Sequence, residues 1–208
     1  MTTGQGGRGV FVALEGGDGA GKSTQARLLR EWLQAQGRTV LLTREPGGSE
    51  LGAEIRRLLL HGDHVSPRAE ALLFAADRAH HVHSVVRPAL ARGEVVVTDR
   101  YLDSSVAYQG AGRDLAGEEV RQLSLWAVEG LLPDLTVLLD VAPGTGRERR
   151  GEVHDRLEAE PDDFHDRVRS GFLALAGAEP HRYLVVDAGL PPAEVHALVR
   201  GRLAGVIA

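Results

Sequence analysis

The sequence predicts an α/β fold in which helices flank a doubly wound, five-stranded parallel sheet. Two observations support this prediction. Short apolar runs rich in β-branched residues alternate along the chain with segments in which apolar residues recur at helical spacing. The short runs are also almost continuously apolar, which is typical of strands buried on both faces of a parallel sheet. Strands joined by helical crossovers form doubly wound sheets with right-handed connections.

The apolar runs give the strands of the expected sheet. The first, VFVALE, lies directly before a glycine-rich stretch, and the last lies near the end of the sequence. The predicted strands are residues 10–15, 38–43, 93–99, 135–141 and 182–188.

Helical spacing predicts the segments between and after the strands. Gly37 ends the first helix, and Ser49 is the expected N-cap of the second. Ser66 and Pro67 form a favourable start for a long third segment, which is expected to be kinked or broken before Pro88. The helical segments are residues 23–36, the stretch that follows Ser49 through Leu59, and residues 66–90, 117–129 and 192–203.

Composition indicates one domain and excludes several partners. The chain shows no linker or repeat, so residues 10–208 are predicted to form a single domain behind a short flexible tail at residues 1–9. The net charge of −5 gives no general attraction to a nucleic acid polymer or an anionic membrane. No run approaches the ~20 apolar residues of a membrane span, and the N-terminus lacks the apolar core of a signal peptide. The absence of cysteine fits a cytoplasmic location.

A glycine-rich stretch between the first strand and the first helix carries the strongest functional signal. The sequence GGDGAGKS matches GxxxxGK[ST], the P-loop pattern, in the context that this motif requires. Glycines let backbone N–H groups converge on phosphate oxygens at the N-terminus of the following helix. Lys22, the only lysine in the chain, would contact the β- and γ-phosphates, and Ser23 would ligate Mg²⁺. The predicted nucleotide-binding residues are Gly16, Gly17, Asp18, Gly19, Ala20, Gly21, Lys22, Ser23 and Thr24.

Arginines near the carboxyl ends of the predicted strands indicate a second anion site. Ligands of α/β proteins bind at this edge of the sheet, and arginine grips phosphate with two parallel hydrogen bonds. We therefore expect a donor triphosphate on the P-loop and a second phosphate on arginines in the same cleft. These arginines are Arg44, Arg56, Arg78 and Arg100.

Two other functional interpretations fit less well. A regulatory GTPase reads guanine with an Asn-Lys-x-Asp motif, which a chain without asparagine cannot contain. The segment DLAG at residues 114–117 matches the GTPase pattern DxxG, but it does not follow a strand. A metal site at His80, His81 and His83 is disfavoured, because no ligand set at structural-site spacing accompanies them.

Five segments between about Val10 and Asp187 resemble successive signatures of the bacterial thymidylate kinases. The most specific is DRYLDSSVAYQGAGR at residues 99–113, since related nucleoside monophosphate kinases share the P-loop but not this string. The others are TREPGGSELGAEIR, EALLFAADRAHHV, PDLTVLLDVAP and DRLE. The resemblance implies a P-loop kinase fold and transfer of the γ-phosphoryl of ATP to dTMP, which gives dTDP for dTTP synthesis. It also implies Mg²⁺ as cofactor and a homodimer.

The resemblance assigns roles in binding the nucleoside of dTMP. Phe74 would stack on thymine, and Arg78, one turn later on the same helix face, would hydrogen-bond the base. Ser105 and Gln109 would complete recognition of the pyrimidine edge. Tyr108 would lie against the sugar, where it leaves no room for a 2′-hydroxyl.

The resemblance also assigns contacts to phosphate and metal. Arg100 and Arg44 would hold the acceptor phosphate, with Arg56 nearby. Asp18 would accept from the 3′-hydroxyl of dTMP and steer its phosphate, and Asp99 would help to position Mg²⁺.

Residues 142–158 resemble the lid that closes over ATP in this family. The P-loop contains no arginine, so the chain resembles members that supply a catalytic arginine from the lid. Arg149 would pack against adenine, and Arg150 or Arg156 would contact the transferred phosphoryl group. The stretch between Arg149 and DRLE is shorter than the family pattern, which leaves the choice between the last two open.

Two alternatives to a thymidylate kinase remain at this point. One is another nucleoside monophosphate kinase, acting on dUMP, UMP/CMP or dGMP. The other is a P-loop regulatory module that hydrolyses nucleotide slowly without an acceptor.

Overall fold

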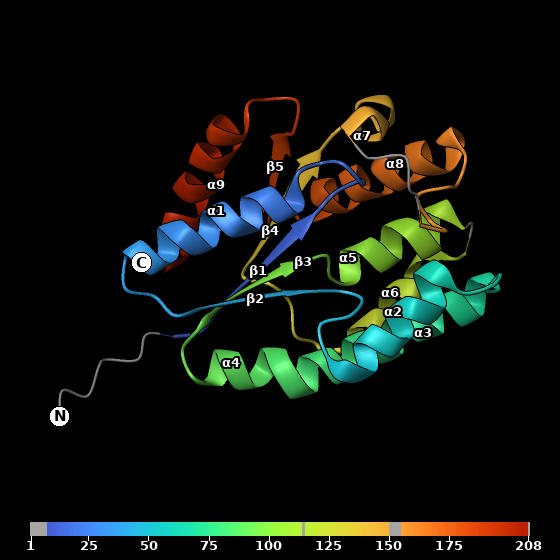
Figure 1. Ribbon diagram of the computed structural model, residues 1–208, viewed down its shortest axis with the longest axis horizontal. Coiled ribbons are helices and arrows are strands. Elements are labelled where there is room, and N and C mark those ends of the chain that lie inside the picture. Colours follow the sequence, from blue (N-terminus) through green and yellow to red (C-terminus); the bar gives the residue numbers. More distant parts are fainter. Residues whose placement is uncertain (1–7, 114, 150–154, 208) are drawn as a thin grey trace.

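The computed structural model describes residues 8–113, 115–149 and 155–207, and its centre is a five-stranded parallel sheet (Figure 1). The strand order β2-β3-β1-β4-β5 places β1 in the middle, so the chain builds first one half of the sheet and then the other. This arrangement confirms the predicted doubly wound fold class. The strands are β1 (Val10–Glu15), β2 (Val40–Arg44), β3 (Val95–Asp99), β4 (Leu135–Asp140) and β5 (Tyr183–Asp187).

Helices cover both faces of the sheet. In Figure 1, α1 and α9 lie together above it, and the group of α2, α3, α4 and α6 lies below. None of the helices within the described ranges has both the length and the apolar character needed to cross a bilayer. The helices are α1 (Lys22–Ala35), α2 (Glu50–His61), α3 (Pro67–His81), α4 (Arg87–Ala91), α5 (Leu102–Ser105), α6 (Gly117–Ala127), α7 (Pro143–Arg149), α8 (Asp162–Ala178) and α9 (Pro192–Ile207), with π-helical segments η1 (Val82–Val86) and η2 (Val106–Gly112).

The two faces of β1 contribute to two different cores, because successive side chains of a strand point to opposite sides. Val12 and Leu14 pack with Leu29 of α1 in the core that also contains α9. Phe11 points the other way and meets the ring of Tyr101 edge to face, with centroids 4.9 Å apart. The central strand is therefore buried on both faces, as its continuous apolar sequence predicts.

The long segment at residues 66–90 differs from its prediction. It does not break before Pro88; instead η1 connects α3 to α4 with helical backbone angles throughout. The proline lies in the first turn of α4, where its missing N–H and fixed φ are tolerated. The segment is therefore continuous through a π turn that precedes Pro88, and the predicted break is wrong.

The helix α8 and the helical stretch α5–η2 are absent from the sequence predictions. Residues Phe164, Val168, Phe172 and Ala176 of α8 are buried at four-residue spacing, which is a recognisable helical pattern. For α5–η2, the string DRYLDSSVAYQGAGR contains several serine, aspartate and glycine residues with weak helix propensity, so tertiary packing on α8 decides its structure.

Candidate active site

A cavity of about 770 Å³ opens at the carboxyl edge of the sheet, the position at which doubly wound proteins bind ligands. It runs from the P-loop and the first turn of α1 to side chains of α3 and η2. Gly16 and Gly17 line a smaller hollow beneath the P-loop instead. The predicted site residues that line the large cavity are Asp18, Gly19, Ala20, Gly21, Lys22, Ser23, Thr24, Arg44, Arg56, Phe74, Arg78, Asp99, Arg100, Ser105, Tyr108, Gln109 and Arg149.

The ammonium group of Lys22 is hydrogen-bonded to the backbone of the P-loop. Its Nζ donates to the carbonyl oxygens of Gly16 at 3.1 Å and Gly17 at 2.9 Å. The residue is 7% exposed, and burial together with the charge of Arg100 lowers the pKa of its amine. Two of the three ammonium hydrogens are occupied, which leaves one to reach a phosphate oxygen.

Ser23 and Asp99 bring two oxygen ligands together beside the P-loop. Ser23 begins the first turn of α1 and Asp99 ends β3, and the Ser23 hydroxyl donates to Oδ2 of Asp99 at 3.0 Å. Hydroxyl and carboxylate oxygens are the ligands that Mg²⁺ prefers. The chemistry of this pair therefore fits the predicted Mg²⁺ site.

Arg100 lies between the P-loop and the other end of the cavity. Its Nη1 donates to the Gly16 carbonyl and to Ser104 Oγ, both at 3.1 Å. Its Nη2 donates to Asp18 Oδ1 at 2.5 Å and to the Tyr108 hydroxyl at 3.1 Å. All four Nη hydrogens are thus engaged within the protein, and only the Nε hydrogen is left for a ligand.

Asp18 is held as a carboxylate by its neighbours. Burial opposes its ionisation, but the charges of Arg100 and Lys22 outweigh burial and hold the pKa of Asp18 well below its usual range. The Tyr108 hydroxyl donates to Oδ2 of Asp18 at 3.0 Å, and burial raises the pKa of Tyr108 above its ordinary value. Tyr108 therefore remains a protonated donor, and its ring is fixed edge to face against Phe164.

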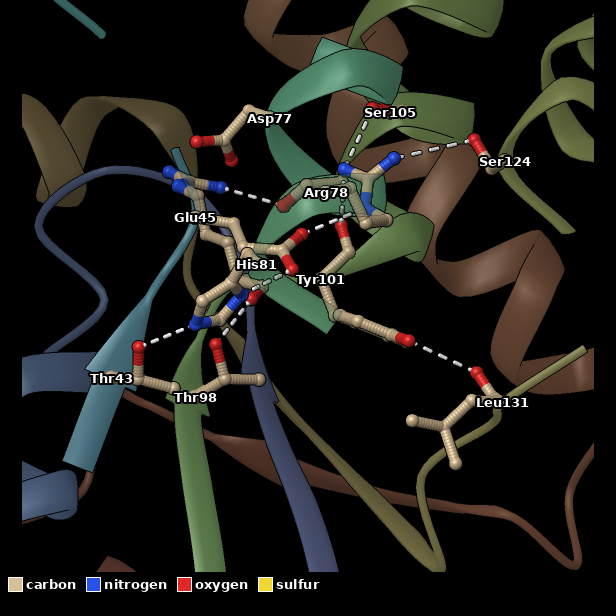
Figure 2. Close-up of polar contacts among 12 residues, drawn as sticks. Thr43, Glu45, Asp77, Arg78, His81, Thr98, Tyr101, Ser105, Ser124 and Leu131 are labelled. Carbon is tan, nitrogen blue, oxygen red and sulfur yellow. Dashed lines mark hydrogen bonds and ion pairs between the residues drawn. The ribbon is translucent and has the colours of Figure 1, made fainter. Parts of the chain in front are cut away.

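Arg78 is 1% exposed and bonded from several sides (Figure 2). Its Nε donates to Glu45 Oε2 at 2.7 Å, and its Nη2 donates to the Tyr101 carbonyl at 3.2 Å and to Ser105 Oγ at 3.0 Å. Its Nη1 makes a long contact of 3.4 Å with Ser124 Oγ. Among the described contacts one Nη1 hydrogen is unused, and Arg78 lines the cavity. That hydrogen is the one available to a base.

Glu45, which the sequence did not single out, connects Arg78 to His81. Glu45 Oε1 lies 2.8 Å from Nδ1 of His81, whose Nε2 lies 2.6 Å from Oγ1 of Thr43, as Figure 2 shows. His81 is therefore part of a buried polar network, whereas His80 and His83 are exposed. Within the described ranges no three His, Cys, Asp or Glu residues form a group that could hold a metal ion.

Gln109 and Arg156 meet at a second carboxylate that the sequence did not single out. Gln109 Nε2 donates to Glu70 Oε1 at 2.9 Å, and Arg113 donates to both oxygens of Glu70. Arg156 donates from Nη2 to Glu70 Oε2 at 2.5 Å and from Nε to the Leu59 carbonyl at 2.9 Å. These bonds tie Arg156 to α2 and α3, so its contact with the transferred phosphoryl group stays a prediction.

Part of the predicted lid, 142–158, borders the donor end of the cavity. Arg149 donates from Nη1 to the Ala188 carbonyl at 2.7 Å and lines the cavity beside Leu190 and Val195. A cation next to apolar side chains is a suitable surface for a planar base. Arg150, the other lid candidate, lies outside the described residues.

Helix α7, which lies in the predicted lid, packs directly on the P-loop. Gly19 has φ +78°, and a Cβ there would lie 2.2 Å from the carbonyl oxygen of Gly146. Only glycine permits both this conformation and this approach. A glycine at position 19 of the P-loop is thus required by the packing of α7 as well as suited to phosphate binding.

Arg44 and Arg56 add two cations to the wall formed by β2 and α2. Arg56 donates from Nη1 to the Pro46 carbonyl at 3.0 Å, and burial together with the charge of Arg44 lowers its pKa. Two like charges at one wall repel each other, so an anion between them would relieve the repulsion.

Glu15 is a third buried carboxylate that the sequence did not single out. It accepts from the backbone N–H groups of Tyr101 and Ser104 at 2.8 and 3.1 Å and from Ser104 Oγ at 2.6 Å. Burial raises its pKa to about 7. Glu15, Glu45 and Glu70 each lie within a segment that carries a motif. That position was the only signal in the sequence that could have indicated a role for them.

A P-loop and an arginine-lined second site in one cavity define a P-loop phosphotransferase with two anionic substrates. Comparison with known proteins makes the assignment specific. The family model described as thymidylate kinase matches residues 14–199. The chain is 64% identical over 204 residues to the thymidylate kinase of Clavibacter michiganensis subsp. michiganensis, covering 96% of this chain and 97% of that protein. It is 66% identical over 202 residues to the thymidylate kinase of Leifsonia xyli subsp. xyli, covering 95% of each.

A solved structure agrees with these sequence relatives. The crystal structure of thymidylate kinase from Ehrlichia chaffeensis superposes with a TM-score of 0.78 at 33% identity, covering 94% of this chain and 98% of that one. The chain belongs to the thymidylate kinase family of phosphotransferases.

Proposed function

We propose that this protein transfers the γ-phosphoryl group of ATP to dTMP, which produces dTDP and ADP. Family membership supports the reaction. The observation in the structure that carries it is Arg100, which is bonded to Gly16 and Asp18 of the P-loop and to Tyr108 of the opposite wall. One side chain therefore links the donor site to the acceptor site.

At the donor site, the P-loop binds the phosphates of ATP and Lys22 supplies its free ammonium hydrogen to them. Arg149 packs against adenine, supported by its place beside Leu190 and Val195. Ser23 and Asp99 would hold Mg²⁺, whose charge neutralises that of the phosphates when the ion is bound. Arg150 is our candidate for the lid arginine that stabilises charge on the transferred group, because Arg156 is bonded elsewhere.

At the acceptor phosphate, Arg44 and Arg56 hydrogen-bond the phosphate oxygens, and Arg100 contributes positive charge. The engaged Nη atoms of Arg100 prevent a two-pronged clamp, so it acts through its Nε hydrogen and its field. Asp18, held ionised, is an acceptor suited to the 3′-hydroxyl of dTMP. Positioning the two phosphates in line is the main task of such a site.

At the acceptor base, Phe74 stacks on thymine and Arg78 donates its remaining Nη1 hydrogen. Phe74 is 8% exposed and lines the cavity one helical turn before Arg78. Tyr108 is fixed by Asp18, and we expect its ring to exclude a 2′-hydroxyl. Ser105 and Gln109 complete the polar contacts to the edge of the pyrimidine.

We propose a homodimer built on the face that α2, α3 and α6 share. Exposed apolar side chains gather on these three helices, among them Leu51 at 49%, Leu72 at 58% and Trp126 at 79% exposure. Exposed apolar patches of this kind mark association surfaces. A cytoplasmic location remains a prediction that rests on the absence of cysteine.

A coupled ADP-release assay with a panel of monophosphates tests the proposed reaction. We expect dTMP to give the highest kcat/KM and dUMP a deficit of ~1–3 kcal/mol, because only one methyl contact is lost. UMP should be much poorer because Tyr108 crowds the 2′ position. Equal kcat/KM for dTMP and UMP, or ADP release that needs no acceptor, would contradict the proposal.

A further inference from the structure

We propose that Glu70 determines the base specificity of the acceptor site by fixing which end of the Gln109 amide faces the base. The inference rests on the proposed function, in which the base of dTMP lies beside Gln109. Glu70 in α3 is 0% exposed and Gln109 in η2 is 1% exposed. The Nε2 of Gln109 donates to Glu70 Oε1 at 2.9 Å.

The charge of Glu70 makes this orientation obligatory. Burial opposes its ionisation, but hydrogen bonds from Arg113, Gln109 and Arg156 outweigh burial and lower the pKa of Glu70. An ionised carboxylate accepts hydrogen bonds and has none to donate. Gln109 must therefore turn its NH₂ group toward Glu70.

The oxygen of the same amide is left for the ligand. Gln109 lines the cavity, and its Oε1 has no donor among the described residues. Gln109 thus offers a base an acceptor, Oε1, and Arg78 offers it a donor, the unused Nη1 hydrogen.

This pair of groups distinguishes pyrimidines by their hydrogen-bonding pattern. Thymine and uracil carry a carbonyl at C4 and an N–H at N3, which match the donor of Arg78 and the acceptor of Gln109. Cytosine carries an NH₂ group at C4 and a bare nitrogen at N3, which oppose both. A site built to satisfy such hydrogens rejects a ligand that lacks them far more strongly than it rejects a missing methyl group.

The Glu70→Gln variant is expected to reverse the amide. Glu70 Oε2 accepts from Arg156 at 2.5 Å and from Arg113 Nη2 at 3.3 Å, whereas Oε1 accepts from Arg113 Nε at 3.2 Å. Because the bond from Arg156 is the shortest of the three, we expect it to keep the oxygen of the new glutamine at the Oε2 position. Its NH₂ group will then face Gln109, which turns its own oxygen inward and presents NH₂ to the base. We expect the ratio of kcat/KM for dTMP over dCMP to fall about tenfold or more, with the KM for ATP unchanged.

A matched control separates specificity from structural damage. Glu160→Gln removes the charge of the other carboxylate that binds Arg113, at 2.5 Å, without touching Gln109, and should leave the dTMP over dCMP ratio unchanged. Glu70→Asp keeps an acceptor-only group and should retain most of the preference. A Glu70→Gln enzyme with the wild-type ratio would overturn the inference, as would an equal fall in Glu160→Gln.

A measurement on the wild-type protein covers the case in which Glu70→Gln does not fold. The chain has no asparagine, so its side-chain amide signals in an NMR spectrum come from glutamines alone. We expect an NH₂ hydrogen of Gln109 to be protected from solvent exchange both without and with dTMP. Protection that appears only with dTMP would contradict the inference. A wild-type enzyme that does not phosphorylate dTMP would instead refute the proposed function.

Discussion

Replacing Glu45 by glutamine tests the buried network that holds Arg78. The two charged groups are 2.7 Å apart, with side-chain exposures of 2% for Arg78 and 1% for Glu45. Removing the charge of one partner in such a buried pair costs about 3–5 kcal/mol, because the other charge is left uncompensated. Glutamine keeps one acceptor oxygen, so we expect the lower end, ~3 kcal/mol.

That loss has a thermal and a kinetic consequence. For a chain of this length 1 kcal/mol shifts Tm by about 2–4 °C, so Glu45→Gln should melt roughly 6–12 °C lower. Arg78 also loses the negative charge that holds its guanidinium in place, so the KM for dTMP should rise about tenfold, the equivalent of one charge-assisted hydrogen bond. The KM for ATP should not change, since Lys22 and Arg149 lie at the other end of the cavity.

Thermal melts and initial rates, each with Ser124→Ala as control, decide the matter. Ser124 contacts the same guanidinium, but only at 3.4 Å, so its loss should cost less than about 1 kcal/mol. If Glu45→Gln melts within the error of the wild type, the buried pair does not stabilise the fold as reasoned. If the KM values for ATP and dTMP rise together, Glu45 does not act through Arg78.

Three further perturbations test other parts of the site. Arg100→Ala should lower turnover with dTMP by at least about 100-fold while the affinity for ATP changes little; equal losses in both would place Arg100 on the donor side. Lys22→Arg should be similarly impaired despite its unchanged charge, because Nζ fits between two carbonyls and is 7% exposed; near-normal turnover would refute this role. Glu15 has a folded pKa of about 7, above its ordinary value, so the stability it contributes is complete below the ordinary carboxyl pKa and is lost as pH rises through about 7. Denaturant titrations from pH 5 to 8 should show this decline in the wild type and a smaller one in Glu15→Gln. If the free energy of unfolding falls equally with pH in both proteins, the raised pKa of Glu15 is contradicted.

Local patterns predicted the sheet and the strand–loop–helix unit around the P-loop well, because each depends on residues close in sequence. The run VFVALE followed by GGDGAGKS specifies a strand, a phosphate loop and a helix within one short segment. Ser49 is likewise the N-cap of α2, with its side chain accepting from the Gly52 N–H at 3.0 Å. Such features need no knowledge of the tertiary fold.

The contacts that decide the acceptor site could not be predicted, because they join distant segments. Arg156 looks like one more lid cation in sequence, yet Glu70, far earlier in the chain, binds it. The buried carboxylates Glu15 and Glu45 carry no pattern of their own, since acidic residues next to a motif are more often solvated.

The transfer of label from ATP carrying a radioactive γ-phosphate tests the central claim most directly. With Mg²⁺ and dTMP present, we expect the label to appear in dTDP in a one-to-one ratio with ADP, and no transfer when dTMP is omitted. Label released as inorganic phosphate at the same rate with and without dTMP would contradict the account, because the second site would then not present an acceptor to the donor.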